Sequence, residues 1–415
     1  MLGHRSKNVL GRVRRAMEDE EEKSRQDNST KGERIKRIAF LICGSIDSLT
    51  GGYIYDKKIV EYLRRVRGYQ VDVLSVPLGS SRWFAIFANV WSALRLLRGR
   101  GGKNYDLVIE DGMIYRSVAI ANSLLRRRAP LLGIVHMIDW RACKSSVAAR
   151  ISRVLEARMV STLSCVVVNS KDTRAQVRSL LRPTSNNADD VASSSSSVVR
   201  LVYPGYETPD RWKGEVEALS DIKSEHLRIL YAGQLIPRKG LHLLVEALSM
   251  LDYDDWMLYV AGDDRCARAY TQHVLELVDA YGLAGRVRML GEVGRERMAR
   301  LMASADLFVL PTMYEAFGIS ILEAQALGVP AVAFRVGGVK EVITDGVTGL
   351  LVEPFDVEEL SCALERILCD PAYRRYLASS ALRLKTREFP SWEECCERFA
   401  ACVDQTLSLN EAKLD

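Results

Sequence analysis

Short apolar runs alternate with helical stretches along most of the chain, and this alternation predicts the fold. The apolar runs of the first half are at 37–43, 71–77, 105–111, 130–136 and 165–170. Those of the second half are at 228–233, 256–262, 286–291, 307–312, 331–334 and 348–354. Strands that alternate with helices form a parallel sheet covered on both faces. We therefore expect an α/β fold with two Rossmann-like, doubly wound domains.

Composition along the chain sets the expected domain boundaries. The four expected segments are a disordered polar tail at 1–34, an N-terminal domain at 35–204, a C-terminal domain at 205–389 and a C-terminal helix at 390–415. A low-complexity stretch rich in serine predicts a flexible insertion at 183–198. In the last segment, Ser391 and Glu394 have the spacing of a helix capping box.

Charge and cysteine usage exclude several classes of protein. The net charge of +5 on 415 residues is too small for a nucleic-acid-binding surface to be expected. No run of 18 apolar residues predicts a transmembrane helix, and the polar N-terminus, acidic at 17–23, does not resemble a targeting peptide. The nine cysteines include no C-x-x-C pair, which favours reduced thiols and a cytoplasmic location.

The strongest chemical motif joins two glutamates around a helix start. Glu315 follows the apolar run at 307–312, Gly318 opens the next helix, and Glu323 lies within that helix. A helix N-terminus presents unpaired N–H groups that suit a diphosphate. Glu315 could then accept bonds from sugar hydroxyls and Glu323 from a ribose. Spacing alone is equally compatible with an amphipathic helix that carries two solvated glutamates.

This segment resembles the E-x7-E motif of glycosyltransferase family 4. The resemblance extends in order over 231–248, 260–264, 311–334 and 336–354. It implies the GT-B fold, in which two domains face a central cleft and the final helix crosses back to the N-terminal domain. It also implies a retaining sugar transfer from a nucleotide sugar held by the C-terminal domain. Within the motif it assigns donor contacts to Phe317, Gly318 and Ile319 as well as Glu323.

A glycine-rich loop after the run at 228–233 supplies adjacent cations. Arg238 and Lys239 precede a predicted helix, where they could clamp a diphosphate. Gly233 and Gly262, which end neighbouring strands, are further donor-binding candidates. A solvated turn is the alternative for this loop, and Gln234 stands where the family usually has arginine.

In the N-terminal half, the candidate residues follow three predicted strands. Gly51 and Gly52 resemble the family's N-terminal glycine loop, which lies near the donor phosphate. His136 matches the family's cleft histidine and could bond the transferred sugar or orient the acceptor. Asp111 is a candidate for acceptor contact. Without the resemblance, a lone histidine at a strand end is more often structural.

The expected reaction is glycosyl transfer without a metal or other cofactor. The resemblance implies that His136, Glu315, Arg238 and Lys239 are the catalytic residues. No D-x-D metal motif or glycosidase-like carboxylate pair is found, so Arg238, Lys239 and the helix N-terminus at Gly318 would neutralise the charge of the leaving group. The acceptor hydroxyl would attack from the leaving-group side, and a donor phosphate oxygen would take its proton. We expect a UDP- or GDP-sugar donor and a glycan, lipid or small-molecule acceptor. A non-catalytic nucleotide-sugar-binding subunit is the alternative, and a sugar-nucleotide epimerase is disfavoured by the glutamate pair.

Aromatic and basic residues of the N-terminal half suggest a further partner. An aromatic stretch at 81–91 is followed by arginine, and more arginines lie at 64–67 and 126–128. Such features could contact an anionic membrane surface peripherally. A core helix with arginines on its wet face is the alternative.

Overall fold

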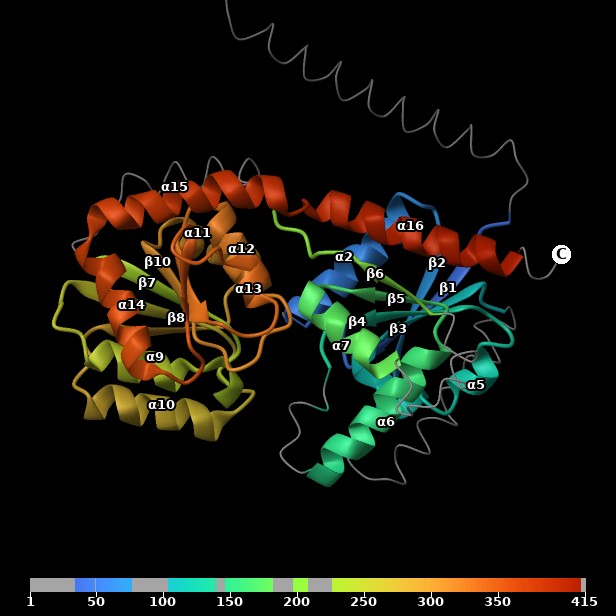
Figure 1. Ribbon diagram of the computed structural model, residues 1–415, viewed down its shortest axis with the longest axis horizontal. Coiled ribbons are helices and arrows are strands. Elements are labelled where there is room, and N and C mark those ends of the chain that lie inside the picture. Colours follow the sequence, from blue (N-terminus) through green and yellow to red (C-terminus); the bar gives the residue numbers. More distant parts are fainter. Residues whose placement is uncertain are drawn as a thin grey trace, which may run out of the picture. The chain divides into compact units, whose positions relative to one another are not determined.

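The computed structural model describes residues 34–48, 50–76, 104–138, 140, 146–181, 197–207 and 226–411. The chain separates into two units, Met1–Lys36 and Arg37–Asp415. The architecture that follows is that of the second unit, which holds two six-stranded sheets. Helices lie on both faces of each sheet (Figure 1).

The N-terminal sheet is parallel throughout. Its strands are β1 (Arg37–Cys43), β2 (Gln70–Val76), β3 (Leu107–Asp111), β4 (Leu131–Val135), β5 (Cys165–Val168) and β6 (Val198–Leu201). Their spatial order is β2-β1-β3-β4-β5-β6. The chain therefore winds outward from β1 in both directions, and the winding reverses between β1 and β3.

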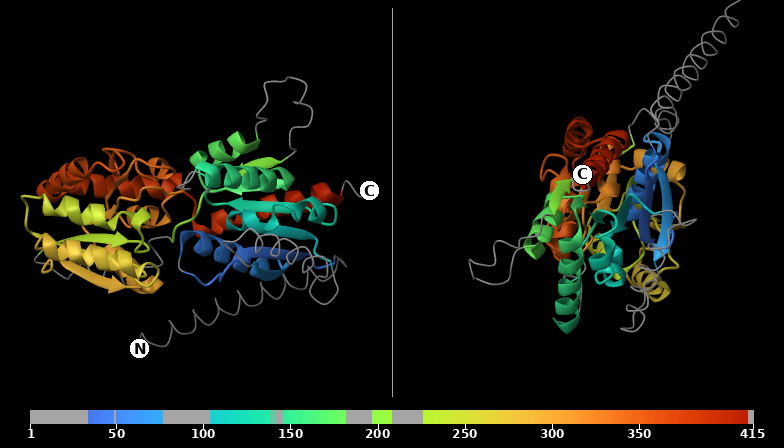
Figure 2. Two further views of the ribbon diagram at one scale, coloured as in Figure 1. Left: turned by 90° about the horizontal axis from the view of Figure 1, so that it is seen from below. Right: turned by 90° about the vertical axis from the view of Figure 1, so that its right-hand side faces the viewer.

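The helices of this half cover the two faces of the sheet with separate cores. They are α2 (Gly51–Arg65), α4 (Tyr115–Val118), α5 (Asn122–Leu125), α6 (Ser146–Thr162) and α7 (Lys171–Leu181). Helices α4 to α7 cover one face, whereas α2 covers the other together with α16 (Trp392–Glu411). Figure 2 shows α16 beside the N-terminal strands. Trp392 and Phe399 of this last helix share a core with Ile38 and Tyr55.

The C-terminal sheet has the same plan. Its strands are β7 (Leu227–Ala232), β8 (Trp256–Ala261), β9 (Val287–Gly291), β10 (Leu307–Leu310), β11 (Ala331–Phe334) and β12 (Gly349–Val352). The order is β12-β11-β10-β7-β8-β9, and every pair is parallel. Here the winding reverses between β7 and β10.

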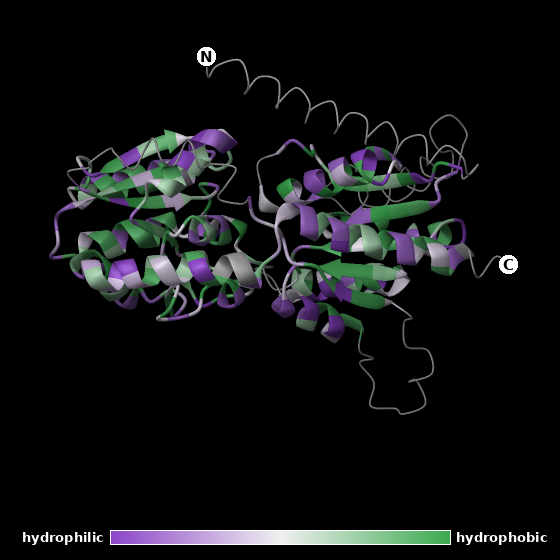
Figure 3. Ribbon diagram, turned by 90° about the horizontal axis from the view of Figure 1, so that it is seen from above, coloured by the Kyte–Doolittle hydropathy of each residue, from purple (hydrophilic) through white to green (hydrophobic). Residues whose placement is uncertain are grey.

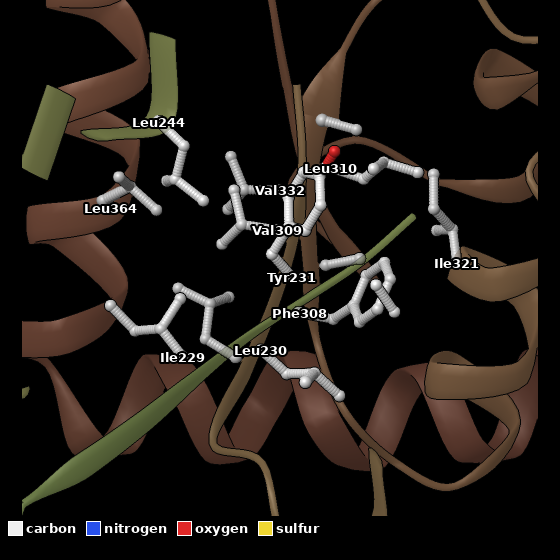
Figure 4. Close-up of a cluster of buried hydrophobic side chains, with 14 of the residues drawn as sticks. Ile229, Leu230, Tyr231, Leu244, Phe308, Val309, Leu310, Ile321, Val332 and Leu364 are labelled. Carbon is white, nitrogen blue, oxygen red and sulfur yellow. The ribbon is translucent and has the colours of Figure 1, made fainter. Parts of the chain in front are cut away.

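Seven helices are described around this sheet: α9 (Leu241–Ser249), α10 (Arg268–Ala280), α11 (Arg295–Ala303), α12 (Ile319–Ala326), α13 (Val339–Val342), α14 (Val357–Cys369) and α15 (Pro371–Glu388). Successive strand residues point to opposite faces, so the strands are apolar on both sides. Figure 4 shows Val309 on the side of Leu244 and Leu364, and Phe308 on the side of Ile321. Figure 3 shows the strands as mainly hydrophobic and the helices as mixed.

The expected pair of doubly wound parallel sheets is confirmed. The expected capping box is also present, since Ser391 N donates to Glu394 Oε2 at 2.8 Å and Glu394 N to Ser391 Oγ at 3.3 Å. One boundary was wrong: Val198 begins strand β6, because β6 pairs with β5 from that residue. The predicted tail up to residue 33 and residues 183–196 of the predicted insertion lie outside the described residues.

Two further observations concern the described residues as a whole. None of their helices is long and apolar enough to cross a membrane. The eight cysteines that the structure describes are all free thiols.

Candidate active site

The first candidate site lies where the winding of the C-terminal sheet reverses. The loops after β7 and β10 meet there, at the carboxyl edge where doubly wound folds bind ligands. We call the group of predicted residues on these loops and on α12 the C-terminal site; its members are Arg238, Lys239, Glu315, Gly318 and Glu323.

An ion pair joins the two loops. Lys239 Nζ lies 2.6 Å from Glu315 Oε2, with side chains only 15% and 16% exposed. Arg238 Nη1 donates to the carbonyl oxygen of Tyr314 at 2.7 Å. Burial alone would raise the pKa of Glu315, but Lys239 and Arg238 outweigh it and lower that pKa. Glu315 is therefore ionised at neutral pH, and the two cations have fixed positions.

Glycines let these loops approach one another closely. A Cβ on Gly240, which has φ of 73°, would lie 1.9 Å from the carbonyl oxygen of Pro311. A Cβ on Gly262 would lie 1.9 Å from the carbonyl oxygen of Gly233. Gly233 and Gly262, the predicted donor-binding glycines that follow β7 and β8, thus contact each other. This contact leaves no room for a side chain at Gly262, whether or not a donor binds there.

The start of α12 is set by another glycine. Gly318 is its N-cap residue, with φ of 101°, a conformation that side chains other than glycine rarely adopt. The loop at 336–341 packs against the segment ahead of it. A Cβ on Gly337 would lie 2.0 Å from the carbonyl oxygen of Glu315, and one on Gly338 would lie 2.2 Å from that of Ala316. This loop therefore fixes the backbone that carries Glu315.

Glu323 belongs to a network that the sequence did not suggest. Its Oε1 lies 3.9 Å from Arg295 Nη2, and Arg295 also donates to Glu207 at 3.0 Å. Lys58 of α2 donates to the same Glu207 oxygen at 2.8 Å. Burial raises the pKa of Glu323 to about 7, and the distant Arg295 offsets this only in part.

The side chains of the two neighbours of Gly318 lie in different surroundings. The Phe317 side chain is 1% exposed and packs against Tyr203 and Phe389, with ring centroids 5.6 Å away in each case. This side chain belongs to the core, so a donor contact by Phe317 would have to involve its backbone and stays a prediction. Ile319 instead reaches the N-terminal glycine loop, where its Cδ1 would lie 3.4 Å from a Cβ on Gly51.

The second candidate site lies where the winding of the N-terminal sheet reverses. It contains Gly51 and Gly52 after β1, Asp111 at the end of β3, His136 after β4, and Asp56 on α2; we call these five residues the N-terminal site. His136 Nε2 lies 3.0 Å from Asp56 Oδ1. One ligand-type atom from each of Asp56, Asp111 and His136 lies within 4.8 Å of the others. These three residues are the group of described residues that could hold a metal ion by residue type.

Burial makes the N-terminal site titratable near neutral pH. Burial and the neighbouring Asp56 raise the pKa of Asp111 to about 7, although His136 opposes this. Burial would lower the pKa of His136, but Asp56 and Asp111 outweigh it and raise that pKa. The titrations of Asp111 and His136 therefore influence each other.

A single carboxylate connects the 336–341 loop to α7. Glu341 accepts hydrogen bonds from the backbone nitrogens of Lys171 and Asp172 at 3.0 Å each, and from Tyr203 Oη at 2.8 Å. The first two bonds place an anion at the N-terminus of α7, where it is stabilised. No specific signal in the sequence pointed to this contact.

The structure thus gathers the predicted residues into two groups and adds Asp56. Asp56 had a sequence signal: it is an acid on the buried face of α2, which also carries Tyr55 and Ile59. Asp263 Oδ1 accepts a hydrogen bond from Arg265 N at 2.9 Å in the turn after β8. Gln234 donates to Cys266 Sγ at 3.9 Å.

Two protein families match the chain. The family of group 1 glycosyl transferases matches residues 215–383, and the glycosyl transferase 4-like domain matches residues 51–188. D-inositol 3-phosphate glycosyltransferase of Corynebacterium diphtheriae is 29% identical over 267 residues, which are 63% of this chain and 60% of that protein. The chain thus spans about three fifths of the length of that relative.

Solved structures have the same fold. Sucrose-phosphate synthase from Thermosynechococcus elongatus superimposes with a TM-score of 0.74 at 22% identity, over 90% of this chain and all of that chain. Anabaena HepE in complex with UDP and glucose superimposes with a TM-score of 0.66 at 21% identity, over 89% of this chain and all of that one. Together with the two family matches, these findings identify the chain as a group 1 glycosyltransferase of the GT-B fold that resembles family 4.

Proposed function

We propose that this glycosyltransferase takes its sugar from a nucleoside diphosphate sugar, UDP- or GDP-linked, and transfers it with retention. The observation that carries the proposal is the C-terminal site. Lys239 pairs with Glu315, and Arg238 donates to the carbonyl oxygen of Tyr314, so both positive charges are held in place. Both contacts are made to the segment that leads into the N-terminus of α12. Cations and a helix N-terminus together suit a diphosphate, and the ionised Glu315 suits sugar hydroxyls.

The relatives support a donor of this class. HepE was solved with UDP and with UDP-glucose, and its fold extends over 89% of this chain. Glu323, near the start of α12, is the residue that would accept from the ribose hydroxyls. Burial raises the pKa of Glu323, and hydrogen bonds from ribose hydroxyls would stabilise its charged form.

In the reaction that we infer, the bond between the anomeric carbon and the diphosphate oxygen breaks. The acceptor oxygen bonds to the same face of that carbon, and the acceptor proton goes to the leaving diphosphate. Arg238, Lys239 and the start of α12 would neutralise the charge that develops on the leaving group. No metal is required in this proposal, because that charge is already met by protein groups.

A donor panel tests this function directly. Purified full-length chain is mixed with UDP-, GDP- and other nucleotide sugars, and its melting temperature is recorded, since a bound ligand stabilises the fold. We expect one donor to raise the melting temperature and to be slowly hydrolysed, with the released sugar first appearing as the anomer of the donor. Chelation should not change the rate. The proposal fails if no nucleotide sugar binds, or if the sugar is released with inversion.

One residue favours a second function, that of a non-catalytic nucleotide-sugar-binding subunit. Gln234 replaces the arginine that is usual in family 4, so one positive charge is missing from the loop after β7. Donor binding without hydrolysis or transfer, even with acceptor extracts added, would favour the subunit. Transfer by the isolated chain would exclude it.

For the acceptor, we propose a glycan or lipid reached from the cytoplasm at an anionic membrane surface. The aromatic stretch at 81–91 lies outside the described residues. The described part of the same half supports the proposal with two sets of exposed residues: the apolar set is Met113, Ile120, Leu124, Val147, Ile151 and Val154, and the basic set is Arg126, Arg127, Arg128, Arg150 and Arg153. Basic groups attract anionic lipid headgroups, and exposed apolar groups can enter the boundary between headgroups and acyl chains. Co-sedimentation with anionic but not neutral vesicles is expected, and equal binding to both would contradict it.

A further inference from the structure

The imidazole of His136 is held by a buried carboxylate on α2. Asp56 Oδ1 lies 3.0 Å from His136 Nε2, and the Asp56 side chain has no exposed surface. Asp111, 1% exposed, approaches the same cluster from the end of β3. His136 itself is 9% exposed. The ends of two strands and one helix therefore converge on one ring that is almost entirely enclosed.

The fold fixes the plane of this ring as well as its hydrogen bond. Gly52 and Asp56 are four residues apart on α2, so they lie on one face of the helix. A Cβ on Gly52 would lie 3.4 Å from His136 Cδ2, and the Tyr55 ring meets the imidazole edge-on with centroids 5.3 Å apart. Thr173 Oγ1 of α7 lies 3.5 Å from the His136 carbonyl oxygen and so helps to hold the backbone that carries the ring. The ring has little freedom to rotate.

The charge around the ring is acidic. The charged groups that face it are Asp56 and Asp111, while the nearby neutral groups are Tyr53, Tyr55 and Cys43. Asp56 Oδ2 is buried and has no hydrogen-bond partner among the described residues. A buried carboxylate in that condition is costly unless a cation lies beside it. Protonated His136 is a cation already in contact with Asp56.

We propose that Asp56 is a positioning residue, which keeps His136 protonated and oriented so that its Nδ1–H donates a hydrogen bond to the transferred sugar. Nε2 is occupied by Asp56, and no described residue accepts from Nδ1, so Nδ1 is the ring atom left for a ligand. A neutral histidine with its proton on Nε2 would offer only an acceptor there, whereas the protonated ring offers a donor. This inference rests on the proposed function and adds to it a residue that never touches the substrate.

The hydrogen bond from His136 Nδ1–H to the sugar should depend on pH. The carboxylates favour the charged ring, so His136 should lose its proton above the ordinary histidine range, and sugar binding through Nδ1–H should weaken there. In Asp56→Asn, the amide oxygen can still accept from Nε2, but the charge is gone. The protonated form then loses its partner, and the decline should occur at lower pH.

Histidine titration by NMR tests the first step without any substrate. The full-length chain is labelled at histidine Cε1; it contains five histidines, and His136→Asn identifies the signal. We expect the His136 midpoint to fall by about one pH unit or more in Asp56→Asn, the usual effect of removing an adjacent opposite charge. Asp56→Glu should restore most of it. Asp47→Asn is the matched control, because this exposed carboxylate of the same region pairs with Lys57 and not with the cluster.

The second measurement is the pH profile of donor hydrolysis, kcat/KM against pH. The falling limb should move to lower pH in Asp56→Asn and stay in place in Asp47→Asn. If Asp56→Asn does not fold, Asp111→Asn removes the other carboxylate. This variant should move both the His136 titration midpoint and the falling limb of kcat/KM to lower pH. An unchanged His136 titration overturns the proposal, as does a shifted titration with an unmoved pH profile. A His136 signal that equimolar Zn²⁺ shifts selectively, and that then no longer titrates, also overturns it, because the ring would be a metal ligand. A shifted titration in a chain that binds no nucleotide sugar would instead overturn the proposed function.

Discussion

The C-terminal and N-terminal sites occupy equivalent places in two sheets of one design, yet they hold charge in opposite ways. Both lie where the winding of a parallel sheet reverses. In the C-terminal site, Lys239 and Arg238 keep Glu315 ionised. In the N-terminal site, Asp56 and Asp111 lie around His136. Burial raises the pKa of Asp111 to about 7, and the two carboxylates raise the pKa of His136. One site is electrostatically fixed, whereas the charge of the other depends on pH.

The backbone plan thus sets where each site lies, and the side chains set how the charge of the site responds to pH. A fixed positive site suits a ligand whose charge is constant, such as a diphosphate. A titratable site suits a neutral ligand, such as a sugar hydroxyl, because it can switch between donor and acceptor. Four substitutions separate these two behaviours.

The largest effect is expected for Lys239→Ala. This change removes a fixed cation and leaves Glu315 part-buried without its partner at 2.6 Å. We expect the transfer rate to fall by about 10²- to 10³-fold at every pH, as when one preorganised charge-stabilising group is lost. Steady-state kinetics from pH 6 to 9 measures this, with Arg297→Ala on the exposed surface of α11 as the control. A loss confined to one end of the pH range would break the distinction between the sites.

The next effect is expected for Glu323→Ala. Loss of a charged acceptor should weaken binding of the free nucleoside diphosphate by about 10- to 100-fold, the range for a hydrogen bond to an ionised group. Because the pKa of Glu323 is raised to about 7, the difference from wild type should be greatest above pH 7 and shrink below it. Isothermal titration calorimetry measures both. Equal affinity in Glu323→Ala and in the surface control Glu296→Ala would exclude the ribose role.

A smaller effect is expected on stability for Glu110→Gln, beside the N-terminal site. Glu110 is fully buried; one oxygen accepts from Asn122 at 2.8 Å and the other has no partner among the described residues. Burial raises its pKa to about 7. The folded state therefore resists ionisation of Glu110, and this lowers the free energy of unfolding. The loss is absent below about pH 4, grows between about pH 4 and 7, and stays constant above about pH 7. We expect Glu110→Gln to gain about 1–2 kcal/mol of unfolding free energy at pH 8.

Urea unfolding at pH 8 and at pH 5.5 measures this prediction. The gain should be smaller at the lower pH, where the folded wild type is already protonated at Glu110. A gain that is the same at both values would mean that shape, and not ionisation, distinguishes the two residues.

The smallest effect is expected for Gln234→Arg. Restoring a cation to the loop after β7 should strengthen nucleoside diphosphate binding by about two- to fivefold, because a charged donor replaces a neutral one. Gln234→Lys, a point charge without the planar fork, should give less. Competition binding measures both. A weaker affinity in Gln234→Arg would show that the C-terminal site is already complete.

The two sheets could be predicted from the sequence, because strands that are buried on both faces of a sheet appear as short continuous apolar runs. The sequence also allowed the loops that carry Lys239, Glu315 and His136 to be predicted. It did not predict Asp56, since contacts between α2 and the loop after β4 join residues 80 positions apart. It did not show that the Phe317 side chain packs in the core, because residues in a motif read alike whether the side chain or only the backbone faces the ligand.

The position of α16 has a consequence for how the protein is made. Trp392 and Phe399 belong to the core that contains β1 and α2, so that core is incomplete until the ribosome has added some 190 residues beyond β6. At synthesis rates of roughly 5–20 residues per second, this delay lasts on the order of 10–40 seconds. During that interval one apolar face of the N-terminal sheet lacks its last helix and is a natural surface for a chaperone. The half of the protein that is made first is thus the half that finishes folding last.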